Sequence, residues 1–213
     1  MNYQPLQYIY HSSGNADAYT LLLLHGTGGD ETDLLPIGKQ FGNNLNVLSL
    51  RGNVNENGMP RFFKRLGMGI FDEKDLEFRT REMVSFIDQL SVKEGFDKNK
   101  IIALGFSNGA NIAGSTLVLY PDFLAGAVLF RPMQPFKNIG AFKNNANTPV
   151  LMTNGSADGT IRKEDTAEYV LQLQQAGFNV SNYTLPTGHG LIQEDLKLAL
   201  NWYKDTFEKK AVL

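Results

Sequence analysis

The pentapeptide Gly-Phe-Ser-Asn-Gly at residues 105–109 constrains the fold of this chain more than any other segment. It directly follows the apolar run 101–104 and directly precedes the small-residue stretch 110–114. A serine at a sharp turn from a strand into a helix has its hydroxyl exposed at the edge of a sheet. The two glycines permit the turn, because a side chain at either position would crowd it. The segment predicts an α/β fold in which Ser107 is a candidate nucleophile.

Short apolar runs alternate with helical patterns along the rest of the chain. Strands are predicted at residues 8–11, 20–24, 47–50, 101–106, 127–130, 150–153 and 180–185, and helices at 72–94, 107–120 and 191–207. Nearly unbroken apolar strands are typical of a mostly parallel sheet that is covered on both faces. We therefore expect one α/β domain over residues 1–213, with about seven strands in a central sheet flanked by helices and no large cap domain.

A nucleophilic serine needs a base and an acid, which in one common fold follow it in the order Ser, Asp or Glu, His. Of the three histidines, only His189, which lies between two glycines, comes late enough to be this base. Asp158 follows the apolar run 149–154, at the same edge of the sheet as Ser107, and is the candidate acid. Two alternatives remain open: Asp158 as a turn or helix-cap residue, and Asp165 as the acid.

A glycine-rich turn at residues 25–29 follows the apolar run 21–24. In esterases a turn of this kind brings a backbone N–H toward the substrate oxygen, so we expect the N–H groups of Thr27 and Asn108 to form an oxyanion hole. The turn lacks the lysine and the glycine spacing of phosphate-binding loops, so nucleotide binding is a much weaker interpretation of this turn than an oxyanion hole. His25 is interpreted as a structural residue of the turn.

Together the segments 24–29, 105–109, 154–158 and 188–190 resemble the phospholipase/carboxylesterase family of α/β-hydrolases, which includes the acyl-protein thioesterases. The resemblance implies an α/β-hydrolase fold, no cofactor and no metal, and a serine carboxylesterase that works through an acyl-enzyme intermediate. Thioesterase and lysophospholipase activity are the alternatives within the family. Thioesterase members carry glutamine where this chain has Asn108, which counts against protein deacylation. A non-catalytic binding protein with this fold is a further alternative, disfavoured by the intact Ser107, Asp158 and His189.

The loops after residues 50 and 130 are expected to frame Ser107, because ligands bind beyond the carboxyl ends of parallel strands. Their apolar side chains are predicted to line the substrate pocket, with an ordinary place in the core as the alternative for each. They are Met59, Phe62, Phe63, Met68, Phe71, Met133 and Phe136. The residues around Phe62 and Phe71 also resemble a bacterial branch of carboxylesterases linked to quinone stress. We expect soluble short-chain or aryl esters as substrates.

Composition narrows the possible partners. A formal net charge of −2 counts against nucleic acid or an anionic membrane as the main partner. The chain has no cysteine, which excludes disulfides, thiolate metal sites and a cysteine nucleophile. Residues 1–10 lack the features of a signal peptide, and no stretch is long enough to cross a membrane. We therefore expect a cytoplasmic enzyme with a small-molecule ester substrate, and a homodimer remains open.

Overall fold

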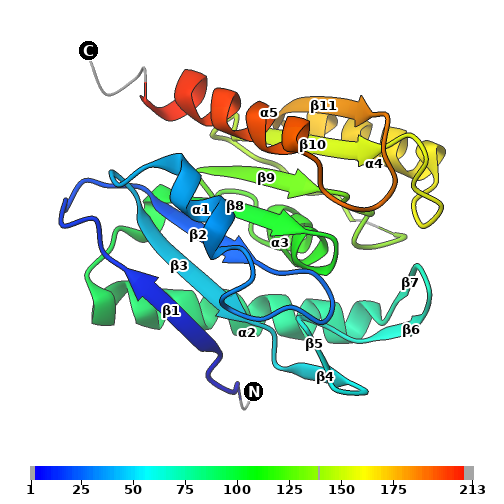
Figure 1. Ribbon diagram of the computed structural model, residues 1–213. Coiled ribbons are helices and arrows are strands. Elements are labelled where there is room, and N and C mark those ends of the chain that lie inside the picture. Colours follow the sequence, from blue (N-terminus) through cyan, green and yellow to red (C-terminus); the bar gives the residue numbers. More distant parts are fainter. Residues whose placement is uncertain (1–2, 139, 209–213) are drawn as a thin grey trace.

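A seven-stranded sheet forms the centre of the computed structural model, which describes residues 3–138 and 140–208 (Figure 1). Both ends of the predicted domain 1–213 lie outside the described residues. The strands lie in the order β1 (Gln7–His11), β3 (Asn46–Arg51), β2 (Thr20–Leu24), β8 (Ile101–Phe106), β9 (Gly126–Phe130), β10 (Pro149–Gly155) and β11 (Asn179–Leu185). Only β1 runs antiparallel to its neighbour. All seven predicted strands and the mostly parallel sheet are confirmed.

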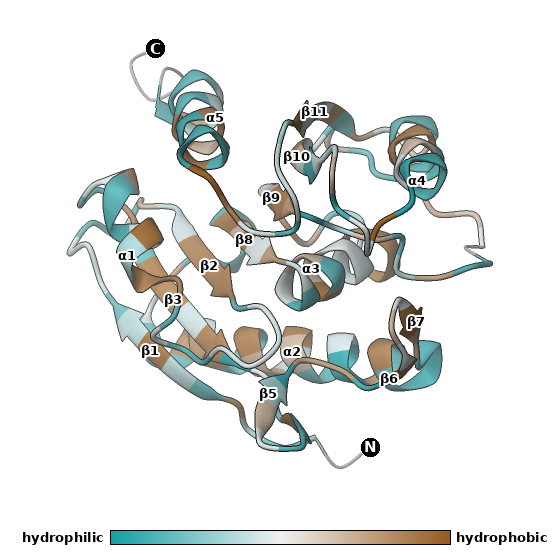
Figure 2. Ribbon diagram, turned by 45° about the vertical axis from the view of Figure 1, so that its right-hand side comes forward, coloured by the Kyte–Doolittle hydropathy of each residue, from teal (hydrophilic) through white to brown (hydrophobic). Residues whose placement is uncertain are grey.

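Helices cover both faces of the sheet (Figure 2). One face packs against α2 (Glu73–Glu94), α3 (Asn108–Leu119) and α4 (Lys163–Gln175), and the other against α1 (Leu35–Gly38) and α5 (Gln193–Tyr203). Each inner strand contributes side chains to the cores on both faces, because successive side chains of a strand point in opposite directions. In β2, for example, Leu22 and Leu24 belong to the first core and Leu21 and Leu23 to the second.

The helix boundaries follow local signals in the sequence. At the start of α2, the side chain of Asp72 accepts a hydrogen bond from the N–H of Asp75 at 3.2 Å. At its end, Gly95 adopts φ 76°, the left-handed conformation in which glycine commonly terminates a helix. Past Tyr203, α5 continues as a π-helical turn, Lys204–Glu208, which carries the buried Phe207 into the second core.

Two short hairpins lie between β3 and α2, and the sequence patterns did not predict them. They are β4 (Val54–Glu56) with β5 (Met59–Arg61), and β6 (Arg65–Gly67) with β7 (Ile70–Phe71). The second projects on the side of the sheet where β8, β9 and β10 end, at the right of Figure 1. In the described part of this segment they are the only regular elements, so the expectation of no large cap domain is confirmed.

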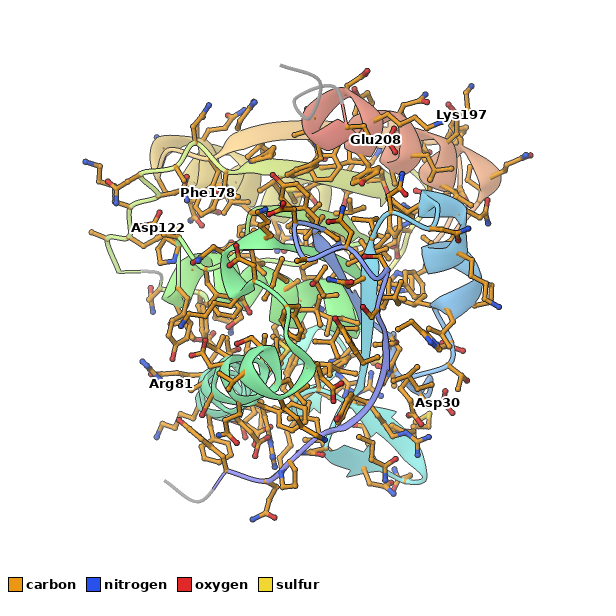
Figure 3. The ribbon with its side chains drawn as sticks, turned by 90° about the vertical axis from the view of Figure 1, so that its left-hand side faces the viewer. Asp30, Arg81, Asp122, Phe178, Lys197 and Glu208 are labelled. Atoms are coloured by element: carbon orange, nitrogen blue, oxygen red, sulfur yellow. The ribbon has the colours of Figure 1, made fainter. Side chains whose placement is uncertain are left out.

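Charged side chains of both signs lie around the outline of the molecule, as the labelled Asp30, Arg81, Asp122 and Lys197 show in Figure 3. Within residues 3–138 and 140–208, no helix has both the length and the apolar character that crossing a membrane requires.

Candidate active site

The turn between β8 and α3 holds Ser107 in a strained backbone conformation. Its φ of 52° and ψ of −111° are rare for a residue with a side chain, and such strain is concentrated at functional sites. The Ser107 N–H donates a hydrogen bond to the carbonyl of Phe130 at 2.9 Å. Gly109 allows the close packing behind the turn, because a Cβ there would lie 1.9 Å from the carbonyl oxygen of Leu24. The turn therefore presents the Ser107 hydroxyl at the carboxyl edge of the sheet.

His189 and Asp158 complete a hydrogen-bonded chain with this serine. His189 Nε2 lies 2.9 Å from Ser107 Oγ, and His189 Nδ1 lies 2.7 Å from Asp158 Oδ2. The Asp158 side chain is only 2% exposed, whereas the His189 side chain is 38% exposed and open to the adjoining cavity. A carboxylate at Nδ1 favours the tautomer in which Nε2 is free to accept the serine proton. The structure thus brings together the three residues that the sequence proposed as nucleophile, base and acid.

The second oxygen of Asp158 is also engaged. Oδ1 accepts hydrogen bonds from the N–H of Thr160 at 2.9 Å and from its hydroxyl. Burial alone would raise the pKa of Asp158, but these bonds and the one to His189 outweigh it, so the pKa is lowered and the carboxylate stays ionised. Asp158 therefore accepts hydrogen bonds from Thr160 within its own turn and also contacts His189. Asp165, the alternative acid, lies in α4 with Arg162 3.9 Å away.

Asp158 and His189 meet because their two loops pack backbone against backbone. The N–H of Ala157 donates to the carbonyl of Thr187 at 3.0 Å. Gly155 makes this approach possible, since a Cβ at that position would lie 2.2 Å from the carbonyl oxygen of Gly188. The loop after β10 is thus fitted to the loop that carries the histidine.

The residues that carry the predicted oxyanion donors border the same cavity as the serine. Thr27 and Asn108 both border the cavity that contains Ser107 and His189. Within the described part of the chain, we find no hydrogen-bond acceptor for the backbone N–H of either residue. The turn that carries Thr27 is anchored from outside: the Arg61 guanidinium donates to Thr27 Oγ1 at 2.7 Å, and the Gly28 N–H donates to the Pro60 carbonyl at 2.9 Å. Two free donors on a fixed backbone suit an oxyanion hole.

The cavity beside Ser107 measures about 250 Å³. Met68, Phe71 and Met133 border it, as expected, but the structure corrects the rest of the predicted lining. Phe62 and Phe63 are 2% and 0% exposed and belong to the core against α2. Met59 lies on the hairpin β4–β5, beside Gly28 and outside the lining, while Phe136 borders a neighbouring cavity of about 330 Å³.

Phe62 and Phe63 turn inward because Asn108 fixes their backbone. The Oδ1 atom of Asn108 accepts a hydrogen bond from the Phe62 N–H at 2.7 Å, which ties the segment after β5 to the serine turn. The Asn108 side chain is buried. It therefore supports the serine turn from the protein interior.

Sequence reasoning missed three residues at this site. Thr160 and Asn111 border the cavity, and Asn111 Oδ1 accepts a hydrogen bond from the Met133 N–H at 2.7 Å. The spacing of four residues between Ser107 and Asn111 on a helix could have indicated that both face the cavity. Arg131 is fully buried directly after β9, and its contacts reach the histidine loop. An arginine at the end of an unbroken apolar strand was the signal for it.

His25 has a structural role in the turn. Its ring lies 4.7 Å from the Phe62 ring, its Nδ1 lies 2.6 Å from the Gly26 carbonyl, and its Nε2 accepts the Gly52 N–H at 3.1 Å. Burial lowers the pKa of His25, although the Gly26 carbonyl and nearby carboxylates oppose the shift. The imidazole is therefore held in its neutral form.

This lowered pKa predicts a pH dependence of stability. Below about pH 6.5 the unfolded chain protonates His25 while the folded protein does not, so the free energy of unfolding falls as the pH drops. We expect the His25→Gln variant to be less stable at pH 7.5 but to lose less stability between pH 7.5 and 5.5 than the wild type. Urea unfolding of both proteins at the two pH values measures the difference. Equal losses of unfolding free energy in the two proteins would show that His25 does not contribute to the pH dependence of stability.

Comparison with known proteins agrees with this geometry. The model of the phospholipase/carboxylesterase family matches residues 9–206. The chain is 45% identical to the hydrolase MhqD of Bacillus subtilis (strain 168), over 94% of this chain and 98% of MhqD. It is 30% identical to acyl-protein thioesterase 1 of Debaryomyces hansenii, over 55% of each chain. A crystal structure of a Bacillus cereus carboxylesterase superposes with a TM-score of 0.91 at 42% identity, covering 95% of both chains. The chain therefore belongs to the phospholipase/carboxylesterase family of hydrolases, and it has the α/β-hydrolase fold.

Proposed function

We propose that this hydrolase cleaves short-chain or aryl carboxylic esters through an acyl-enzyme on Ser107. The observation that carries the proposal is the continuous hydrogen-bond chain from Ser107 Oγ through His189 to Asp158 at the edge of a cavity. Such a chain makes a hydroxyl nucleophilic, because the imidazole accepts the proton as the oxygen attacks.

The reaction has two halves with the same machinery. Ser107 Oγ attacks the ester carbonyl while His189 Nε2 takes the hydroxyl proton, and the tetrahedral oxyanion accepts hydrogen bonds from the N–H groups of Thr27 and Asn108. His189 then protonates the departing alcohol, which leaves the acyl group on Ser107. A water then attacks this acyl-enzyme while His189 Nε2 takes its proton. The tetrahedral intermediate collapses as His189 returns that proton to Ser107 Oγ, which restores the serine and releases the acid. Each oxyanion donor lowers the barrier by about 3 kcal/mol.

The size of the cavity favours small substrates. Its volume of about 250 Å³ lies below the usual range for drug-sized ligands, about 300–1,000 Å³. Met68, Phe71 and Met133 offer an apolar wall to an acyl or aryl group, and each buried methylene contributes about 0.8 kcal/mol until the space is filled. The neighbouring cavity of about 330 Å³ also borders Phe71 and Met133 and lies open for the other half of the ester.

A thioester is the second candidate substrate. The similarity to acyl-protein thioesterase 1 of Debaryomyces hansenii supports it, and the same attack by Ser107 would cleave an ester or a thioester. In this chain Asn108 Oδ1 accepts the Phe62 N–H, and its Nδ2 is buried without a hydrogen-bond partner in the described residues, which counts against contact between this amide and the substrate. The cytoplasmic location and the homodimer remain predictions.

A panel of p-nitrophenyl esters from acetate to palmitate, with emulsified triglyceride beside it, tests this substrate class. We expect kcat/KM to rise over the first few methylenes and then to level off or fall, with no increase in rate at a lipid surface. Met68→Ala should weaken the gain per methylene. Met59→Ala is the matched control on the other hairpin and should leave it unchanged. A steady rise to palmitate, or activation by the emulsion, would contradict the short open pocket.

A further inference from the structure

Arg131 is buried next to the active site but does not touch the reacting groups. It directly follows β9, its side chain has no exposed surface, and its backbone adopts φ 56°. Its N–H donates to the carbonyl of Thr153 in the neighbouring strand β10 at 2.8 Å. A positive φ on a large residue and a buried cation are both costly, so the surrounding contacts must hold this side chain in place.

One side of the guanidinium is fixed to the body of the protein. Its two terminal nitrogens donate to the two oxygens of Asp195 at 2.8 and 2.7 Å, and one of them also donates to Thr153 Oγ1 at 2.8 Å. Asp195 lies in the first turn of α5 and accepts further hydrogen bonds from the Thr153 hydroxyl at 2.6 Å and the Ile192 N–H at 2.9 Å. A bidentate pair of this kind fixes the plane of the guanidinium as well as its position.

The rest of the guanidinium is directed at the histidine loop. Nε donates to the carbonyl of Gly188 at 3.3 Å, and a terminal nitrogen donates to the carbonyl of Gly190 at 3.1 Å. These are the residues immediately before and after His189. One rigid cation thus binds the backbone on both sides of the base and links it to β10 and α5.

We infer that Arg131 is a positioning residue that sets the location of the His189 imidazole relative to Ser107. This inference rests on the proposed function of Ser107 and His189. The glycines that flank His189 leave its backbone with unusually wide conformational freedom, and the hydrogen bonds from Arg131 restrict that freedom. The 2.9 Å contact between His189 Nε2 and Ser107 Oγ depends on this restriction, since a displacement of about 1 Å can cost about 100-fold in rate.

A purely structural role is the competing explanation, because breaking any buried ion pair destabilises a protein. The two roles differ in what they change while the protein remains folded. A structural pair affects the free energy of unfolding alone. A positioning residue also lowers kcat, leaves KM nearly unchanged, and weakens the contact between His189 and Asp158. Lysine is the informative substitution, since an ammonium retains the charge but cannot reach both glycine carbonyls and both Asp195 oxygens in one plane.

The test compares Arg131→Lys with Arg79→Lys at a temperature where circular dichroism shows both to be folded. Arg79 pairs with the buried Glu82 on α2 at 2.7 Å and serves as a matched control outside the site. We expect Arg131→Lys to reduce kcat and the rate of fluorophosphonate labelling at Ser107 about 10- to 100-fold, with KM changed less than about threefold. The low-field proton NMR signal of the His189–Asp158 hydrogen bond should broaden or disappear. Arg79→Lys should retain the wild-type rates and signal.

A folded Arg131→Lys variant with wild-type kcat and labelling rate would overturn the inference. If that variant does not fold, Asp195→Asn replaces it, because an amide cannot accept both guanidinium nitrogens. A smaller loss of kcat with the same change in the proton signal supports the inference there, and unchanged values overturn it. Failure of the proposed function is a separate result, since the wild-type protein itself would then not be labelled at Ser107.

Discussion

Replacing Ser107 by alanine is expected to reduce ester turnover by at least about 10⁴-fold while the protein stays folded. The substitution removes the attacking oxygen, so His189 has no proton to accept and no acyl-enzyme can form. Stability should change little, because alanine keeps the Cβ and the same backbone conformation at φ 52°, and only the hydroxyl with its contact to His189 Nε2 is removed. Initial rates with p-nitrophenyl acetate, together with thermal unfolding of both proteins, measure the two effects.

Ser156→Ala is the control for this experiment. Ser156 is an exposed serine in the loop after β10, near the same edge of the sheet, and its hydroxyl makes no hydrogen bond within the described residues. Its variant should retain the wild-type rate. A folded Ser107→Ala protein that hydrolyses the ester at a near-wild-type rate would sink the mechanism, since the attacking atom would have to come from elsewhere.

Asp158→Asn is expected to lower kcat by up to about 10⁴-fold, a severe loss but a less complete one than that of His189→Ala. The asparagine amide can present an N–H to His189 Nδ1, which favours the tautomer whose Nε2 carries a proton and cannot act as a base. Hydrogen bonds to Thr160 and His189 keep the pKa of Asp158 low despite its burial, so the carboxylate is ionised throughout the range in which the enzyme would be assayed. The contribution of the ionised Asp158 carboxylate to kcat is therefore constant above about pH 5 and is lost only at acid pH.

Asp165→Asn is the control, because it makes the same chemical change at a nearby aspartate in α4. Asp165 lies in α4, and its side chain is 47% exposed beside Arg162. Asp165 also borders the neighbouring cavity of about 330 Å³, so its variant should change KM at most and keep the wild-type kcat. The opposite pattern, with a silent Asp158→Asn and an impaired Asp165→Asn, would transfer the acid role to Asp165.

The five inner strands of the sheet were predictable from the sequence because they contain short apolar runs that are buried on both faces. The edge strands β1 and β11 are partly exposed, and β11 contains Ser181, Asn182 and Thr184, so their signal was weaker. The hairpins β4–β5 and β6–β7 gave none, since strands of two or three residues are too short to show a period. Their position over the active site depends on contacts that are far apart in sequence, such as Arg61 with Thr27 and the Phe62 N–H with Asn108.

The proposed triad was predictable for a different reason. Ser107, Asp158 and His189 each follow a strand and stand beside glycines that mark a tight turn, and the order along the chain assigned a role to each. The residues of the pocket were harder to predict, because an aromatic residue in a loop can either line a pocket or pack in the core. Phe62 and Phe63 are buried in the core, while Phe71 borders the cavity. Arg131 was missed because its partners lie far from it in the sequence: the Asp195 carboxylate, the Thr153 hydroxyl and the carbonyls of Gly188 and Gly190.

Fluorophosphonate labelling followed by peptide mass mapping tests the central claim most directly. The reagent modifies a serine only where a neighbouring base has activated it, so it reports on the contact between His189 and Ser107 without reference to any particular ester. We predict a single adduct on the peptide that contains Ser107, its absence in Ser107→Ala, and labelling slowed by orders of magnitude in His189→Ala. An unlabelled wild-type protein, or an adduct on another residue that persists in Ser107→Ala, would contradict the account.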